Sequence, residues 1–260
     1  MLLALLLLAG LCACGEKSEG PFRALEVVGT KHYCGICRGG DKLAPVILAA
    51  VEALAGTGTL SALSVKWLGS DRICMDGNAA ALSELEELPE PRTLIFGIPS
   101  EFHPLGYLEY DEPRGFAADI AAAVGELLGW EVRLLCISPD EVGSQLNSGN
   151  IDCAMGFDSN LDHAEKFTIG GCFLESDILL AVRSESEVRK PKDLEGCRIG
   201  TINDPVVLKA IRGDEKITKY ATGATEYLSL PRCIEALDLG WCSAVVLDSL
   251  MLTYYQMQEK

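Results

Sequence analysis

The chain has 260 residues, 48% of them hydrophobic and 23% charged, a globular composition with room for two lobes of about 100 residues each. Its formal net charge is −16, from 38 acidic and 22 basic residues, so it would repel nucleic-acid phosphates and we expect no nucleic-acid partner. After residue 12 no stretch of 18 or more positions is apolar, which argues against an internal membrane span.

The N-terminus has the pattern of an export signal. Residues 1–11 are almost entirely Leu and Ala, too short a run to span a bilayer. The run Leu11-Cys12-Ala13-Cys14 that follows resembles the bacterial lipoprotein signal, although no Lys or Arg precedes it. The resemblance implies a signal peptide over 1–14 with lipidated Cys14, a tether over 15–20, and a lipid-anchored protein at the extracellular face of the bacterial membrane or in the periplasm. An ordinary cleaved signal and a buried start are the alternatives.

The cysteines indicate no metal site. Nine remain after Cys12 and Cys14, an odd number that cannot all pair. Cys34 and Cys37 have the spacing of a redox motif, but no helix start follows Cys34 to lower a thiol pKa. Several others lie within apolar runs, so we interpret most of them as small buried hydrophobic residues. Only three histidines occur, none near a cysteine pair at finger spacing, and we expect no metal and no cofactor.

The first half of the chain alternates predicted helices and strands. Residues 41–56 have apolar side chains at helical spacing, with Asp41 as N-cap and Gly56 as the stop, and a second short helix follows over 59–69. Residues 70–91 form a polar linker. The next elements are predicted as a strand at 93–97, a helix at 116–129, a strand at 132–137, a helix from the Ser138-Pro-Asp-Glu141 capping box to Gly149, and a strand at 151–155.

The second half repeats this alternation. Strands are predicted over 177–182, 197–201 and 243–247, with helices from about 204, over 229–239 and over 249–258. Strands separated by helices of this length predict parallel sheets, and the run 146–155 is echoed in 237–246, which suggests two lobes. Ligands bind beyond the carboxyl ends of such strands. These ends are 100–103, 157–160, 202–204 and 248, and two lobes that face each other there would form a cleft.

Five motifs lie along the chain: residues 97–107, Gly115-Phe116 with Asp119-Ile120, 146–154, 164–167 and 190–200. Together they resemble solute-binding protein family 3, the polar amino acid-binding proteins of ABC importers. The resemblance implies an α/β, two-lobed, type II periplasmic-binding-protein fold, in which each lobe is a mostly parallel sheet flanked by helices. It implies a monomer, not an enzyme, that captures a small polar ligand (an amino acid or amine) between the lobes by hinge closure and delivers it to an ABC permease.

The order of the parts differs from that of the family. The family's last elements, which end in a Lys-Trp-Phe-Gly run, resemble residues 33–69, whereas residues 246–255 resemble the segment that normally precedes them. We therefore predict a circular permutation in which residues 70–91 join the former termini. A fused fragment of a second copy is the alternative. The predicted lobes are 41–174 for lobe 1, and 21–40 with 175–260 for lobe 2.

The resemblance also implies roles for single residues. Asp248 matches the carboxylate that binds the ligand's ammonium group, with a helix cap as the alternative, and Phe102 matches the aromatic wall, with a plain core residue as the alternative. The other candidates are three residues of a loop that offers backbone and hydroxyl contacts, and two at a helix N-terminus whose free N–H groups would hold a carboxylate. They are Phe157, Asp158 and Asn160 in the loop, and Asn203 and Asp204 at the helix.

His163 stands where the family has the arginine that clamps the ligand's carboxylate. An imidazole does not replace a bidentate guanidinium without a loss of about 1.5–3 kcal/mol. Either His163 is a weaker and pH-sensitive partner, or it is structural, or the ligand is not a standard α-amino acid. Asp158 would suit a cationic ligand. The alternative functions are a ligand-sensing lipoprotein without a transporter and a dehydratase-like enzyme on the same fold.

Overall fold

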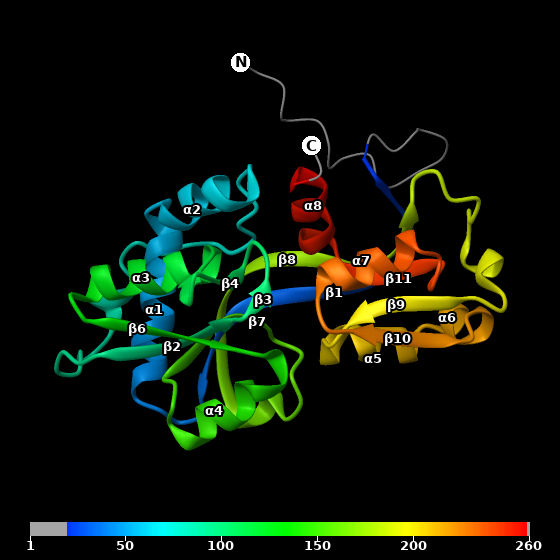
Figure 1. Ribbon diagram of the computed structural model, residues 1–260. Helices are drawn as coiled ribbons and strands as arrows, with labels where there is room; N and C mark the ends of the chain where they lie inside the picture. The colour runs from blue at the N-terminus through cyan, green and yellow to red at the C-terminus, as the bar shows by residue number, and fades with distance from the viewer. Residues whose placement is uncertain (1–19, 259–260) are drawn as a thin grey trace, which may run out of the picture. The chain divides into compact units, whose positions relative to one another are not determined.

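The computed structural model describes residues 20–258 and divides into two compact units (Figure 1). Among the described residues, unit 1 comprises 20–30 and 176–258, and unit 2 comprises Lys31–Glu175. The chain passes between the units in two long strands, β1 (Phe22–Arg38) and β8 (Phe167–Arg183). The predicted signal peptide with Cys14, and all of the tether except Gly20, lie outside the described residues.

Unit 2 is built on the strand order β1-β7-β2-β6. β7 (Cys153–Asp158) pairs antiparallel with β1 and parallel with β2 (Leu94–Pro99), which in turn pairs parallel with β6 (Val132–Ile137). The central strands β2 and β7 are apolar and mostly buried, as strands covered on both faces are, while β6 alternates between partly buried and exposed residues. β1 pairs with β7 over Tyr33–Cys37, within unit 2, which begins at Lys31.

Helices and a small second sheet complete unit 2. The Ser138–Glu141 capping box is confirmed: Glu141 accepts hydrogen bonds from the backbone N–H and the hydroxyl of Ser138, both at 2.8 Å, and the turn leads into α4. The helices are α1 (Leu43–Gly56), α2 (Thr59–Leu68), α3 (Phe116–Leu128) and α4 (Val142–Ser148), and the three-stranded sheet has β3 (Glu101–Phe102), β4 (Gly106–Glu109) and β5 (Glu112–Arg114).

The early segment 33–69 packs against the later part of unit 2. Asp119 of α3 accepts a hydrogen bond from Trp67 Nε1 at 2.7 Å and one from Lys66 Nζ at 2.5 Å, both residues of α2. α1 is apolar because most of its residues are buried in this core.

Among the described residues no single helix is long and apolar enough to cross a membrane. α1 and α2 reach that length only together, with a bend of 78° between them.

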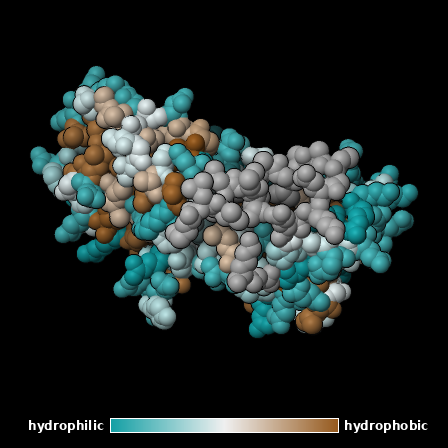
Figure 2. Space-filling model, turned by 90° about the horizontal axis from the view of Figure 1, so that it is seen from above, coloured by the Kyte–Doolittle hydropathy of each residue, from teal (hydrophilic) through white to brown (hydrophobic). Residues whose placement is uncertain are grey.

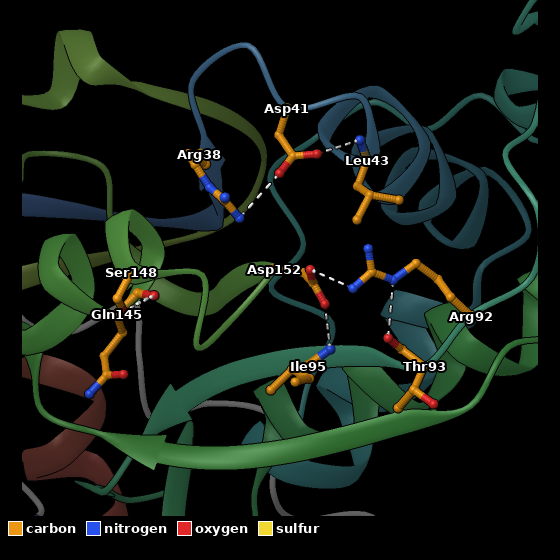
Figure 3. Close-up of polar contacts among 9 residues, drawn as sticks. All are labelled: Arg38, Asp41, Leu43, Arg92, Thr93, Ile95, Gln145, Ser148 and Asp152. Atoms are coloured by element: carbon orange, nitrogen blue, oxygen red, sulfur yellow. Dashed lines mark hydrogen bonds and ion pairs between the residues drawn. The ribbon is translucent and has the colours of Figure 1, made fainter.

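Two carboxylates of unit 2 hold backbone segments in place (Figure 3). Asp152, within the motif 146–154, accepts a hydrogen bond from the backbone N–H of Ile95 at 2.8 Å and one from Arg92 at 3.3 Å, so it joins the start of β7 to β2. Asp41 accepts from the N–H of Leu43 at 2.9 Å, so it satisfies a donor at the start of α1 although Lys42 has the N-cap position. The motif aspartate is therefore a structural residue.

Unit 1 has the strand order β10-β9-β11-β8. The pairs β10–β9 and β9–β11 are parallel and the pair β11–β8 is antiparallel, so the sheet is mostly parallel, like that of unit 2. Its core cluster includes Ile178, Leu180, Ile199 and Val246. The elements are β9 (Arg198–Ile202), β10 (Gly223–Tyr227), β11 (Ala244–Asp248), α5 (Pro205–Gly213), α6 (Glu215–Tyr220), α7 (Leu230–Asp238) and α8 (Ser249–Gln258).

The cysteines divide into one disulfide and several thiols. Cys34 and Cys172 form a disulfide within unit 2, 138 positions apart in the sequence. The interpretation as buried hydrophobic residues is confirmed for Cys37, Cys153, Cys233 and Cys242. Burial raises the pKa of Cys233 to about 12 and that of Cys242 to about 11, so both are neutral thiols near pH 7. Among the residues coloured by hydropathy in Figure 2, hydrophilic ones predominate, with smaller groups of apolar residues among them.

Replacing Asp152 by Ala should destabilise the protein by about 1–3 kcal/mol, because the buried N–H of Ile95 would lose its acceptor. The matched control is Asp76→Ala, at an exposed carboxylate of the same unit, which should change stability by less than about 0.5 kcal/mol. Urea unfolding followed by circular dichroism measures both. Equal stabilities of the two variants would contradict the structural role of Asp152.

Candidate functional site

The aromatic residue predicted as the ligand wall lies beside a buried tyrosine and a buried lysine. Phe102 of β3 is partly exposed, and its ring meets that of Tyr33 edge to face, with centroids 5.5 Å apart. Tyr33 belongs to β1 and is 1% exposed. Lys31, two residues earlier on the same strand, is 3% exposed, and its Nζ lies 5.5 Å from the centroid of each ring. Unit 2 therefore presents two rings and one ammonium group together.

The predicted loop residues 157–160 are split between a strand and a turn. Phe157 and Asp158 are the last residues of β7, and the Phe157 side chain packs in the core cluster with Ile36 and Leu146, so only its backbone is left for a ligand. Asp158 is buried and accepts hydrogen bonds from the backbone N–H groups of His32 at 2.9 Å and of Asn160 at 2.6 Å. Its carboxylate thus holds the edge of the sheet, and Asn160 itself is exposed.

His163 has the exposure of a surface residue. Its side chain is 70% exposed, its φ is 61°, and Nδ1 lies 3.6 Å from an equally exposed carboxylate oxygen of Glu165. The left-handed backbone at His163 begins a short 3-10 turn over Ala164–Lys166. A side chain so exposed and turned toward Glu165 is poorly placed to replace a buried clamping arginine.

In unit 1 the predicted ammonium-binding carboxylate is buried at a strand end. Asp248 is the last residue of β11 and is 1% exposed. Its Oδ1 accepts hydrogen bonds from the Ser176 hydroxyl and from the N–H of Leu250, both at 2.7 Å. The helix-cap alternative is therefore realised at the start of α8, where the carboxylate is held by donors of its own unit.

Asp204, the second candidate of unit 1, does not leave the helix N-terminus open for a ligand carboxylate. Asp204 caps α5, because its Oδ1 accepts from the N–H groups of Val206 at 3.0 Å and Val207 at 3.2 Å. These are the donors that were expected to hold a ligand carboxylate, and the protein's own carboxylate occupies them instead. Asn203 is exposed beside this cap.

Sequence reasoning missed three residues that the structure brings to these strand ends. Lys31 and Tyr33 lie two residues apart on β1 and so share one face of the strand, a spacing that could have indicated them. Nothing in the sequence indicated Ser176, which is identified only by the hydrogen bond from its hydroxyl to Asp248.

His103 of unit 2 stacks on Tyr107, with the ring centroids 3.9 Å apart. Burial lowers the pKa of His103, and the charge of Glu109 opposes this effect.

A cavity of about 410 Å³ lies elsewhere in unit 2. Its lining comes from α1, from the 70–91 linker and from Gly170 and Gly171 of β8, and it includes Glu52 and Glu84. None of the predicted site residues lines it.

The main strands form one eight-stranded sheet that is mostly parallel within each unit and flanked by helices, and solved structures with this architecture are type II periplasmic-binding proteins, so the predicted fold class is confirmed. The family profile of the bacterial extracellular solute-binding proteins, family 3, matches residues 94–228, just over half of the chain. The chain belongs to this family. No curated protein matches it in sequence.

Solved structures show the same fold at low sequence identity. The truncated, arginine-bound ArgBP from T. maritima is 18% identical, with a TM-score of 0.51 over 64% of this chain and 78% of that one. A substrate-binding protein of an ABC uptake transporter from Streptococcus pneumoniae, with bound histidine, is 19% identical, with a TM-score of 0.51 over 64% and 70%. The ancestral amino acid-binding protein AncCDT-1, a precursor of cyclohexadienyl dehydratase, is 18% identical, with a TM-score of 0.51 over 64% and 74%.

Replacing His163 by Ala should leave both stability and ligand affinity nearly unchanged. The imidazole is exposed and its contact with Glu165 is a surface ion pair, worth at most about 1 kcal/mol. Thermal unfolding, and titration with any amino acid that the wild type binds, test this. A tenfold loss of affinity in the variant would restore His163 as a ligand partner.

Proposed function

We propose that this protein is the substrate-binding lipoprotein of an ABC importer and captures an amino acid or a similar small polar solute. Membership of solute-binding protein family 3 supports this proposal. The structurally similar proteins include one bound to arginine and one bound to histidine. The lipid anchor at Cys14, the permease partner, the cleft and the hinge closure come from the sequence and its resemblance, and they stay predictions.

The buried carboxylate of Asp248 is the observation on which the ligand class depends. A zwitterionic amino acid needs an anion for its ammonium group, and Asp248 is an anion at the carboxyl end of a sheet strand, where ligands of α/β folds bind. At 1% exposure its charge is weakly screened. The bonds from Ser176 and Leu250 fix the carboxylate before a ligand arrives, so little ordering of this group accompanies binding.

Replacing Asp248 by Asn should weaken amino acid binding by about tenfold to a hundredfold, the loss expected for one charge-assisted hydrogen bond. The amide oxygen of Asn can still accept from Ser176 and Leu250, so the variant should fold. The measurement is thermal shift and calorimetric titration of the full chain with the twenty standard L-amino acids.

Glu185→Gln, which removes an exposed charge from the same unit, is the matched control and should bind like the wild type. If no amino acid shifts the melting temperature of the wild type, the proposed ligand class is wrong. If Asp248→Asn binds as tightly as the wild type, the ammonium contact is wrong.

We also propose that the chain order is a circular permutation of the family's order. The match to the family begins at residue 94, although Tyr33–Cys37 pair with β7 and Trp67 bonds Asp119 within the same unit. The run 86–90 is mostly exposed and lies between these two segments, where the former termini would be joined.

A specific protease site inserted within 86–90 tests this order. After cleavage in dithiothreitol, which opens the Cys34–Cys172 disulfide, the two fragments should co-elute from size exclusion with an unchanged far-UV spectrum. An independent, fused copy fragment would instead separate from the remainder of the chain.

A further inference from the structure

The proposed function leaves the ligand's carboxylate without the partners that were expected for it. His163 is exposed and turned toward Glu165. The N–H groups of Val206 and Val207 at the start of α5 donate to Asp204. An amino acid nevertheless needs a cation or several donors for its carboxylate, because an anion taken out of water without them is costly.

Lys31 offers a cation of the required kind next to the aromatic wall. Its Nζ lies 5.5 Å from the ring centroids of both Phe102 and Tyr33, within the range of a cation–π contact. Its position two residues before Tyr33 on β1 puts both side chains on one face of the strand. Lys31 is only 3% exposed, and a lysine buried to this extent has partners around it, here including the two rings.

We propose that Lys31 binds the α-carboxylate of the amino acid ligand, the task that the resemblance assigns to an arginine at the position of His163. The inference rests on the proposed function and names the cation that this function requires. Two ring faces hold the ammonium group in a region of low exposure, where its attraction to a carboxylate is weakly screened by water and salt.

The same geometry bears on the ligand's side chain. An ammonium group at the face of Phe102 repels a second cation, so the ligand's side chain beside this ring is neutral or acidic rather than basic. Asp158, which had suggested a cationic ligand, accepts hydrogen bonds from the N–H groups of His32 and Asn160 and serves the fold.

The test compares amino acids with their α-amides, which lack the carboxylate charge. Calorimetric titration of the full chain with the twenty standard L-amino acids and their α-amides should show the best amino acid binding at least tenfold more tightly than its amide. Lys31→Met keeps the apolar stem over the rings and removes the charge. This variant should lose about tenfold to a hundredfold in affinity for the amino acid and less than threefold for the amide.

The controls separate this inference from the proposed function. Lys166→Gln, an exposed lysine of unit 2, should bind like the wild type, and Lys31→Arg should keep the preference for the amino acid over the amide. If the wild type binds no amino acid, the proposed function fails. If it binds an amino acid and the amide equally well, or if Lys31→Met binds the amino acid within threefold of the wild type, the role of Lys31 is wrong and the function stands. If Lys31→Met does not fold, Lys31→Gln takes its place.

Discussion

The antiparallel pairing of β1 with β7 is the contact on which the rest of unit 2 depends. β7 also pairs in parallel with β2, so it joins β1, near the start of the chain, to a strand that begins only at Leu94. Most residues of α1 are buried in the core of this unit, and Lys66 and Trp67 of α2 donate hydrogen bonds to Asp119 of α3. If the pairing were removed, residues 31–69 would have an apolar surface without a partner.

Buried carboxylates at strand ends are used in the same way in both units. Asp158 ends β7 and Asp248 ends β11, and each accepts hydrogen bonds from backbone N–H groups of the chain around it. Each carboxylate is therefore fixed in direction by the fold rather than by a ligand. Each carboxylate therefore has a structural role of its own, and at Asp248 an asparagine that keeps the acceptor separates this role from the proposed ligand contact better than an alanine does.

The sequence predicted elements with a strong apolar period and missed those without one. Residues 116–128 and 43–56 have buried faces at helical spacing and were expected as helices. The strand Gly223–Tyr227 lies at the edge of its sheet, is mostly exposed and has no apolar alternation, so no signal marked it. β8 was expected as a shorter strand, over 177–182, because a strand that serves two cores in succession does not keep one period along its length.

The candidate site could be predicted by position but not by role. Strand ends follow from the order of elements, and they led to Asp248 and to Asp158. Whether a carboxylate there meets a backbone N–H or a ligand depends on the local turn, which composition does not determine. Lys31 was missed for a similar reason: a single lysine on a strand is usually solvated, and its spacing from Tyr33 is only a weak signal without the packing of the two rings around it.

The disulfide between Cys34 and Cys172 gives the two units different connectivity. It joins positions close to both ends of Lys31–Glu175, so unit 2 is almost a closed covalent ring from which the two segments of unit 1 extend. Closing a ring of this size removes entropy from the denatured chain worth about 5 kcal/mol in the loop-closure description. Within the described residues of unit 1 the cysteines are free thiols. The ring therefore reduces the chain entropy that unit 2 loses on folding, a contribution that the described residues of unit 1 do not receive from a disulfide.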